Sequence, residues 1–421
     1  MIVKLAYGDG YLSVDLPGDQ TTVITSLEQP GLPDEQAGFR TAVEAPIGTG
    51  PLRERVGSGK QICIVFTDIT RATPNERIIP WLLTYLGDCG VEPDQITLIN
   101  GLGTHTPNNP EQLSKMLTPA VVRDYRVLNH EAEDPAELVQ VGMTAAGAPA
   151  LLNRHLVEAD VRIITGFIEP HFFAGFSGGP KGIMPGVAGM KTVISNHGRA
   201  NIANPNAAFG ITDGNPLWEE MRDIALLAGP SFLINVTLNE ARAITGFFAG
   251  DLIAAHKQGC EFVRASAMQP VHELFDIVIT TNSGYPLDQN LYQAVKGMSA
   301  AARIVKKGGS IIIAAECRAG IPEGSPFEEL LSRAKDPEDL LAIIAHETYP
   351  EQWQSQIQSL IQRKAKIFIH SSLGDDAVRT AHLLPAGDIS ALVDKLQAAI
   401  GHPARVAVLP QGPLTVPYLP Q

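Results

Sequence analysis

The sequence has few cysteines, no long apolar run and no excess of basic residues, and each absence excludes a class of protein. Its four cysteines, Cys63, Cys89, Cys260 and Cys317, are scattered without a C-x-x-C pair, which argues against a disulfide framework or a zinc site. No apolar stretch reaches the ~20 residues that span a bilayer. The N-terminus lacks the basic start and apolar run of a signal peptide. We therefore expect a cytoplasmic protein without a membrane partner.

The charge balance narrows the class of partner. The chain carries 45 acidic and 32 basic residues, for a net charge of −13. An acidic surface disfavours nucleic acid as a partner. It does not exclude a small anionic substrate, because a few basic side chains in a cleft can override the global sign. With 421 residues, 44% of them hydrophobic, the chain suits a globular protein of two or three domains.

Short apolar runs alternate with helical patterns along most of the chain, which is typical of an α/β fold with a mostly parallel sheet. The expected strands lie at residues 61–66, 96–100, 161–165, 276–281, 310–315, 367–371 and 406–409. Helices are expected from residue 75, within 247–263, at 288–304 and at 390–400, and a hairpin at 1–16. In such sheets, ligands bind beyond the carboxyl ends of the strands.

A change of composition near residues 266–270 predicts a domain boundary. We expect a larger N-terminal domain over residues 1–268. A smaller C-terminal α/β domain is expected over residues 269–399.

Two candidate sites follow predicted strands. Residues 67–75 contain three threonines and the start of a helix, a combination that favours an anion such as phosphate or carboxylate, and Arg71 could grip a carboxylate with two hydrogen bonds. A plain helix cap with a surface Asp68–Arg71 pair is the alternative. The second segment, Gly-Leu-Gly-Thr-His105-Thr, lacks the third glycine of a dinucleotide fingerprint. His105 alone could be structural.

A glycine-rich stretch provides the most informative segment. Eight glycines lie from Gly166 to Gly198, around His171, Lys181 and His197. Glycine lets the backbone approach a bound group closely, so this stretch predicts a pocket built around a cofactor. A phosphate loop is disfavoured, because Lys181 is followed by glycine instead of serine or threonine. Each histidine taken singly could also be a structural residue.

The last candidates lie in the C-terminal part. Asp288 could cap the helix that follows it, and Tyr292 and Lys296, four residues apart, share one helix face with Gln293 beside them. A solvated helix face is the alternative. Trp353 stands at the start of another helix, where packing is its simplest role.

Taken together and in this order, these segments resemble the nickel-pincer-nucleotide-dependent lactate racemases and their 2-hydroxyacid racemase relatives, over most of the chain. The resemblance implies a larger N-terminal cofactor-binding α/β domain, to which residues 400–421 return, and a smaller C-terminal α/β domain, with the active site in the interdomain cleft. It implies a nickel pincer nucleotide, a pyridinium-3-thioamide-5-thiocarboxylic acid mononucleotide carrying Ni(II), as the cofactor. It further implies a small 2-hydroxy acid substrate and separate cofactor-maturation enzymes, and leaves homo-oligomer formation open.

The resemblance also implies a role for each candidate residue. Lys181 would hold the cofactor covalently and His197 would bind the nickel, while His105 and His171 would be the acid/base pair. Cofactor contacts are expected from Asp68, Thr70, Gly178 and Gly179. Substrate contacts are expected from Arg71, Tyr292, Gln293, Lys296 and Trp353.

The implied reaction is racemisation by reversible hydride transfer, and it makes chemical sense. Removing a proton from C2 would leave a carbanion beside a carboxylate, whereas removing hydride leaves a neutral ketone. Histidine, with an unperturbed pKa of about 6.5, suits transfer of the hydroxyl proton. Three alternatives remain open. They are a cofactor-carrying or binding protein without turnover, an NAD-dependent dehydrogenase, and a zinc hydrolase that uses the three histidines.

Overall fold

The computed structural model describes residues 1–420 and divides the chain into two compact units. The central unit comprises residues 28–201 and 206–264, and the terminal unit comprises Met1–Leu27, Ile202–Pro205 and the chain from Ala265 onward. The change of unit at Ala265 lies close to the boundary expected at residue 268.

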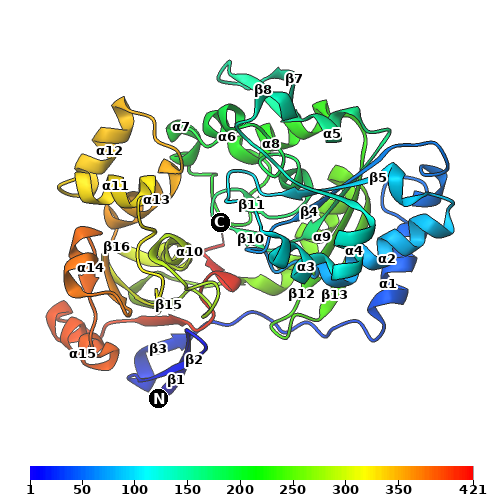
Figure 1. The fold of residues 1–421 in the computed structure, drawn as a ribbon. Helices are drawn as coiled ribbons and strands as arrows, with labels where there is room; N and C mark the ends of the chain where they lie inside the picture. The colour runs from blue at the N-terminus through cyan, green and yellow to red at the C-terminus, as the bar shows by residue number, and fades with distance from the viewer. Residues whose placement is uncertain (421) are drawn as a thin grey trace. The chain divides into compact units, whose positions relative to one another are not determined.

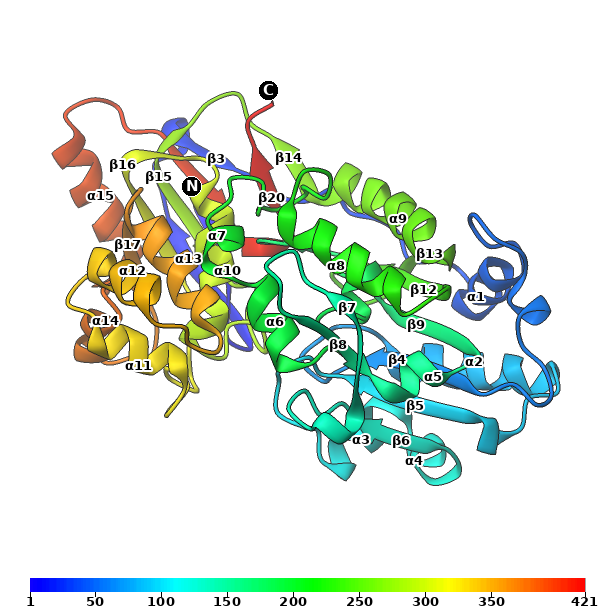
Figure 2. The ribbon, with the colours of Figure 1, turned by 90° about the horizontal axis from the view of Figure 1, so that it is seen from above.

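The central unit is built on a six-stranded sheet with the order β13-β12-β9-β4-β5-β6 (Figure 2). All neighbours are parallel except the edge pair β12–β13. The strands are β4 (Ile62–Thr67), β5 (Ile96–Gly101), β6 (Arg126–Asn129), β9 (Val161–Phe167), β12 (Ser231–Leu238) and β13 (Ile244–Asp251). The expected strands at 61–66, 96–100 and 161–165 are confirmed. Strands β12 and β13 were not expected. Strand β13 ends at Asp251, inside the 247–263 segment that was expected to contain a helix, and the helix α9 begins at Leu252.

Helices and short strands surround this sheet. The helices are α1 (Glu35–Glu44), α2 (Asn75–Asp88), α3 (Pro110–Leu117), α4 (Pro119–Asp124), α5 (Arg154–Glu158), α6 (Met190–Asn196), α7 (Arg199–Ile202), α8 (Pro216–Leu227) and α9 (Leu252–Ala267). The additional strands are β7 (Leu138–Met143), β8 (Pro149–Asn153), β10 (Pro170–His171) and β11 (Gly175–Phe176). Helix α2 begins at Asn75, as expected.

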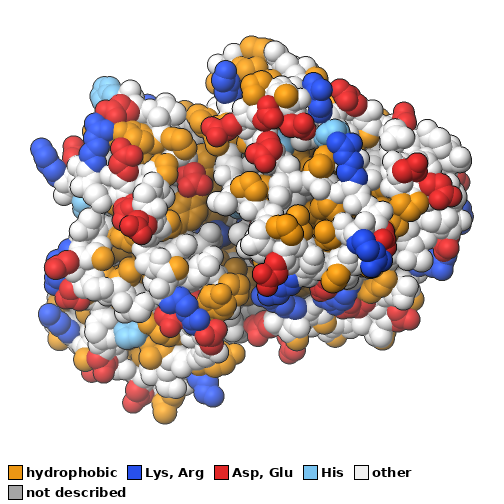
Figure 3. Space-filling view, viewed as in Figure 1, with side chains coloured by type: hydrophobic (Ala, Val, Ile, Leu, Met, Phe, Trp, Pro, Cys, Tyr) orange, Lys and Arg blue, Asp and Glu red, His pale blue; other side chains and the backbone are white. Residues whose placement is uncertain are grey.

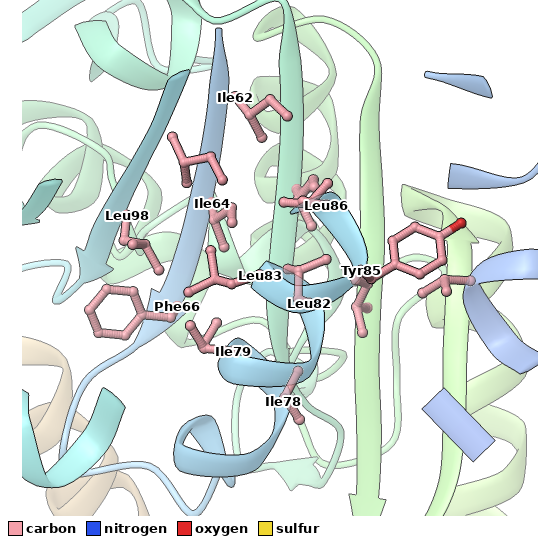
Figure 4. Close-up of a cluster of buried hydrophobic side chains, with 14 of the residues drawn as sticks. Ile62, Ile64, Phe66, Ile78, Ile79, Leu82, Leu83, Tyr85, Leu86 and Leu98 are labelled. Atoms are coloured by element: carbon pink, nitrogen blue, oxygen red, sulfur yellow. The ribbon is translucent and has the colours of Figure 1, made fainter. Parts of the chain in front are cut away.

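Helix α2 packs an apolar face against the sheet, which shows why a buried strand followed by an amphipathic helix folds into an α/β layer. Apolar residues recur every three or four positions in α2, so one face of the helix is apolar. Ile78, Ile79 and Leu82 on that face are fully buried with Ile64 and Phe66 of β4 (Figure 4). At about 25 cal/mol per Å² of apolar surface removed from water, burial of each such side chain contributes about 1.5–3 kcal/mol. This core holds β4 in place, and the candidate residues begin where β4 ends.

The terminal unit contains a second six-stranded sheet with the order β18-β17-β16-β15-β19-β3, in which every pair is parallel. Its strands are β3 (Thr21–Val23), β15 (Phe275–Thr281), β16 (Val305–Ala314), β17 (Lys366–His370), β18 (Leu384–Pro385) and β19 (Val406–Leu409). The hairpin β1 (Ile2–Tyr7) and β2 (Gly10–Asp15) and the pair β14 (Met268–Pro270) and β20 (Val416–Tyr418) also belong to it. The helices are α10 (Leu291–Ala302), α11 (Pro326–Arg333), α12 (Pro337–His346), α13 (Gln352–Gln362), α14 (Asp375–Thr380) and α15 (Ile389–Ile400).

Both ends of the chain contribute to this second sheet, whereas the sequence placed residues 1–27 and 400–421 in the larger domain. Strand β19 pairs with β15 on one side and with β3 on the other. The hairpin β1–β2 and α15 pack onto the same face of the sheet and form an apolar core with Ile277 and Ile279 of β15 (Figure 1). Strand pairing between distant segments leaves no local pattern in the sequence, so the place of these terminal strands in the second sheet could not be predicted from it.

Within residues 1–420, no helix is both long enough and apolar enough to cross a membrane. Acidic and basic side chains are interspersed over the face drawn in Figure 3.

Candidate functional site

The candidate residues of the central unit gather at the carboxyl ends of adjacent parallel strands. Asp68 follows the last residue of β4, and Thr67 lies opposite Gly101, the last residue of β5. His105 lies four residues beyond β5, and His171 is in the short strand β10, soon after β9. This is the edge of a parallel sheet at which ligands bind, so the fold places the expected histidines and Asp68 at the same end of one sheet.

Asp68 and His105 form a hydrogen-bonded pair. His105 Nδ1 lies 2.7 Å from Asp68 Oδ2, and the Thr70 amide donates to Asp68 Oδ1 at 2.7 Å. Asp68 is 3% exposed. Burial alone would raise the pKa of Asp68, but hydrogen bonds from His105 and Thr70 and the charge of Arg71 hold it well below its usual value. The carboxylate is therefore ionised, so the neutral His105 ring carries its proton at Nδ1 and presents the lone pair of Nε2.

The loop that carries His105 is anchored by buried amides. Asn100 Nδ2 donates to Asn108 Oδ1 at 2.9 Å and to Asn129 Oδ1 at 3.0 Å, and Asn129 Nδ2 donates to the Asn108 carbonyl at 2.9 Å. The His105 amide donates to the Leu102 carbonyl. Asn100 is completely buried, so these bonds form where breaking one would leave an unsatisfied polar group. The loop is thus fixed on both sides of His105.

His171 has different surroundings. It is 7% exposed and contacts the rings of Phe172 and Phe173, with centroids at 5.0 and 4.5 Å. The Ala174 amide donates to His171 Nδ1 at 3.2 Å. An acceptor at Nδ1 means that the neutral ring carries its proton at Nε2. The two candidate acid/base residues therefore have opposite tautomers.

Lys181 and His197 lie close enough to interact electrostatically. Lys181 is in a short 3-10 helix over residues 179–182, and His197 is the C-terminal cap of α6. The pKa of His197, which is 3% exposed, is lowered to about 3 by burial first and then by the positive charge of Lys181. The ring of Phe173 contacts both His197, at 5.1 Å between centroids, and His171. His197 is therefore a neutral imidazole, the form that binds metals.

The donor set limits what kind of metal site His197 can form. Among residues 1–420, no three His, Cys, Asp or Glu side chains are grouped so that they could hold a metal ion. His197 can therefore supply one ligand, and a four-coordinate metal would need its other donors from a bound group. A cofactor that brings three donors to a square-planar nickel fits this arrangement, and a lysine amine close by is the group that could attach such a cofactor.

Gly178 and Gly179, expected at the cofactor, are explained by contacts within the chain. Gly178 has φ +75° and Gly179 has φ +54°, which is the left-handed region where other residues are strained. A Cβ at Gly178 would collide with the Asn235 side chain, and one at Gly179 would collide with the His256 ring. Thr70, also expected at the cofactor, likewise has a bond within the chain, because its amide donates to Asp68 Oδ1.

The remaining candidates lie in the terminal unit. Tyr292, Gln293 and Lys296 are in α10, where Lys296 Nζ donates to Gln293 Oε1 at 2.6 Å and the Tyr292 ring packs against Phe327. Trp353 is in the first turn of α13 and is 7% exposed. Tyr292, Gln293 and Lys296 thus share one element, as their spacing predicted.

Asp288 does not have the capping role expected of it. The N-terminal cap of α10 is Asn290, whose side chain accepts from the Gln293 amide. Asp288 is completely buried, and its Oδ2 accepts from the Gly8 amide at 2.8 Å and the Glu316 amide at 3.0 Å. It therefore fixes the turn of the β1–β2 hairpin, a long-range contact that spacing could not reveal.

Comparisons with known proteins identify the family of this chain. The family model for the lactate racemase N-terminal domain matches residues 7–210, and the model for the C-terminal domain matches residues 271–416. The chain belongs to the lactate racemase family. Family membership makes it an isomerase of the racemase type.

Similar proteins cover almost the whole chain. A lactate racemase from Lactiplantibacillus plantarum is 35% identical over 95% of this chain and 98% of its own length. One from Thermoanaerobacterium thermosaccharolyticum is 33% identical over 97% of both. The solved structure of a lactate racemase apoprotein from T. thermosaccharolyticum superposes with a TM-score of 0.92 at 32% identity, covering 99% of this chain and 100% of that one. A crystal structure of a Thermotoga maritima protein, 20% identical with a TM-score of 0.69, shares the fold, covering 92% of this chain and 98% of that one.

Two residues that the sequence did not single out, Asn235 and His256, contact the segment that carries Lys181. Asn235 Oδ1 accepts from the Gly179 amide at 2.7 Å, and His256 Nε2 lies 2.9 Å from the Ser177 carbonyl oxygen. Asn235 did leave a signal, because it is a polar residue within the apolar run of β12. That strand was not expected, so the signal was missed. His256 gave none, because a histidine in an amphipathic helix is common.

Proposed function

We propose that this protein racemises a small 2-hydroxy acid, lactate or a close relative, with a nickel pincer nucleotide joined covalently to Lys181 and ligated through its nickel by His197. The observation that carries the proposal is the neighbouring pair of Lys181 and a buried, neutral His197. Two relatives named lactate racemase support the substrate class. When bound, the cofactor would accept the C2 hydrogen as hydride and return it.

His105 is assigned as the base for the hydroxyl proton of one enantiomer. Asp68 holds its ring through Nδ1 at 2.7 Å, which leaves the lone pair of Nε2 to accept the proton. The ionised carboxylate then stabilises the imidazolium that forms. This arrangement supports turnover over a carrier without activity, because a carrier has no use for an oriented base. It also suggests that Asp68, expected at the cofactor, acts by orienting His105.

His171 is assigned the same task for the other enantiomer, whose hydroxyl points in a different direction. In the tautomer described, its Nε2 carries a proton, because Nδ1 accepts from the Ala174 amide. Its ring must change tautomer, which gives up that bond, before Nε2 can accept a proton. The aromatic rings of Phe172 and Phe173 pack against its ring. The two directions of the reaction therefore depend on the two histidines unequally.

The substrate carboxylate needs positive charge and hydrogen-bond donors. Arg71, whose charge already acts on Asp68, is assigned to the carboxylate, as a guanidinium can hold it with two hydrogen bonds. The substrate-binding roles of Tyr292, Gln293, Lys296 and Trp353 rest on the family resemblance. We further propose a cytoplasmic location and maturation by separate cofactor-synthesising enzymes.

Intact-mass measurement of protein produced beside the maturation enzymes tests the attachment. Wild type should carry an adduct that Lys181→Arg lacks, while Lys191→Arg, a control in the same segment, should keep it. Substrate deuterated at C2 then tests the reaction: hydride transfer should retain the label during inversion. Exchange of the label with solvent, or an unmodified wild type that does not interconvert chiral 2-hydroxy acids, would overturn the proposal.

A further inference from the structure

The turn that leads into Lys181 is held from two sides by buried side chains of other elements. We propose that Asn235 of β12 and His256 of α9 are positioning residues that fix this turn and so set where the Lys181 side chain begins. The inference rests on the proposed function in one respect only, namely that Lys181 carries the cofactor.

Asn235 supports the turn from the sheet. It lies opposite Gly166 in the parallel pair β12–β9 and is completely buried. Its Oδ1 accepts from the Gly179 amide at 2.7 Å. Gly178 leaves room for it, because a Cβ there would collide with Oδ1. A side chain from within one strand thus supports the backbone of a loop that follows the neighbouring strand.

His256 supports the same turn from the helix. Its Nε2 lies 2.9 Å from the Ser177 carbonyl oxygen, and its ring occupies the space that a Cβ at Gly179 would need. Trp218 stacks on the other side, with centroids at 6.1 Å and an interplanar angle of 14°. Since a carbonyl oxygen only accepts, Nε2 must donate. Burial lowers the pKa of His256 to about 4, so the ring donates from the neutral form.

The two contacts act on the backbone immediately before the lysine. His256 holds the carbonyl of Ser177 and Asn235 holds the amide of Gly179, so the peptide units on both sides of Gly178 are fixed. The Lys181 amide then donates to the Gly178 carbonyl at 3.1 Å. With these supports in place, the lysine needs little ordering of its backbone to meet the cofactor, which is the benefit of a preorganised site. Neither contact reaches the lysine side chain itself.

Hydrogen exchange on the apoprotein tests the support without any cofactor. Asn235→Leu keeps the approximate volume but cannot accept from the Gly179 amide, whereas Asn235→Asp keeps the acceptor. Leucine should speed exchange in residues 177–182 by about tenfold or more, the effect of losing one buried hydrogen bond, and aspartate should restore slow exchange. In His256→Gln, which can still donate a hydrogen bond, residues 177–182 should exchange more slowly than in His256→Leu.

The matched control is Asn153→Leu. Asn153 is buried, and its side chain bonds to the His155 amide and to His130, outside residues 177–182. Its loss should therefore lower thermal stability without changing exchange in residues 177–182. Unchanged exchange at the turn in Asn235→Leu, or an equal increase in Asn153→Leu, would overturn the positioning role.

Cofactor loading tests the consequence. At equal concentrations of folded protein and maturation enzymes, Asn235→Leu should form the Lys181 adduct several-fold more slowly than wild type, and Asn235→Asp should recover most of the rate. If leucine loads at the wild-type rate, the link from turn to lysine is wrong even if exchange increased. If wild type itself forms no adduct, the proposed function fails, while the exchange result still decides whether the turn is supported.

Discussion

The substitution Asp68→Asn replaces one carboxylate oxygen of Asp68, the partner of His105, with an NH2 group. The structure determines what that change does. Asp68 Oδ1 accepts from both the amide and the hydroxyl of Thr70. In Asp68→Asn, the carbonyl oxygen must keep that side, because an NH2 group there would face the Thr70 N–H. The amide NH2 then faces His105 Nδ1, 2.7 Å away in the native pair. His105 Nδ1 must accept, so the proton of the neutral ring moves to Nε2 and the base is lost.

The expected size of the effect follows from the chemistry of such pairs. Placing histidine in the wrong tautomer by the same substitution lowers kcat by about 10⁴ in a serine protease. We expect a loss of about 10³- to 10⁴-fold here, or about 4–5 kcal/mol in activation free energy. The proposed adduct at Lys181 should persist, because the side-chain hydrogen bonds of Asp68 go to Thr70 and His105.

The assay is the initial rate of interconversion of D- and L-lactate, each used as substrate, for wild type and variant with equal adduct content by intact mass. Nitrogen-15 NMR of the histidine rings should show the His105 proton at Nδ1 in wild type and at Nε2 in Asp68→Asn. Thr70→Val is the control, since it removes the hydroxyl but keeps the amide donor, and it should cost less than about tenfold, the loss expected for one hydrogen bond. A fully loaded Asp68→Asn enzyme within tenfold of wild type in both directions would refute the reasoning.

The remaining predictions concern acid stability, packing and substrate binding. Burial lowers the pKa of His197 to about 3 and of His256 to about 4. As pH falls below about 6.5, the unfolded state therefore binds more protons at these histidines than the folded state does. The free energy of unfolding should drop by about 1.4 kcal/mol per histidine between pH 7.5 and 5.5. Urea denaturation at both pH values should show this, and His256→Gln should remove its share. Gly297→Ala should destabilise the fold, because its Cβ would collide with a carbonyl oxygen of β15, and a Tm within 1 °C of wild type would contradict this. Lys296→Met removes the ammonium group that donates to Gln293 at 2.6 Å. It should raise KM for the hydroxy acid by about 10- to 100-fold, as for loss of a charged hydrogen bond, with the adduct intact. An unchanged KM would count against a role in substrate binding.

Local patterns in the sequence determined the fold class and the elements that carry the site. The apolar runs of β4, β5 and β9 identified buried parallel strands, because both faces of such strands are covered. The polar residues directly after them identified Asp68, His105 and His171 as candidates, because carboxyl ends of parallel strands meet at one edge.

Only the tertiary structure decided which of these residues touch and what supports them. The pairing of Asp68 with His105, the opposite tautomers of the two histidines and the neutral state of His197 depend on contacts and burial between distant segments. The contact of Asn235 with the turn before Lys181 likewise joins residues 56 positions apart. Such contacts follow from how strands are ordered in a sheet, and strand order is a property of the whole chain that no local spacing of residues encodes.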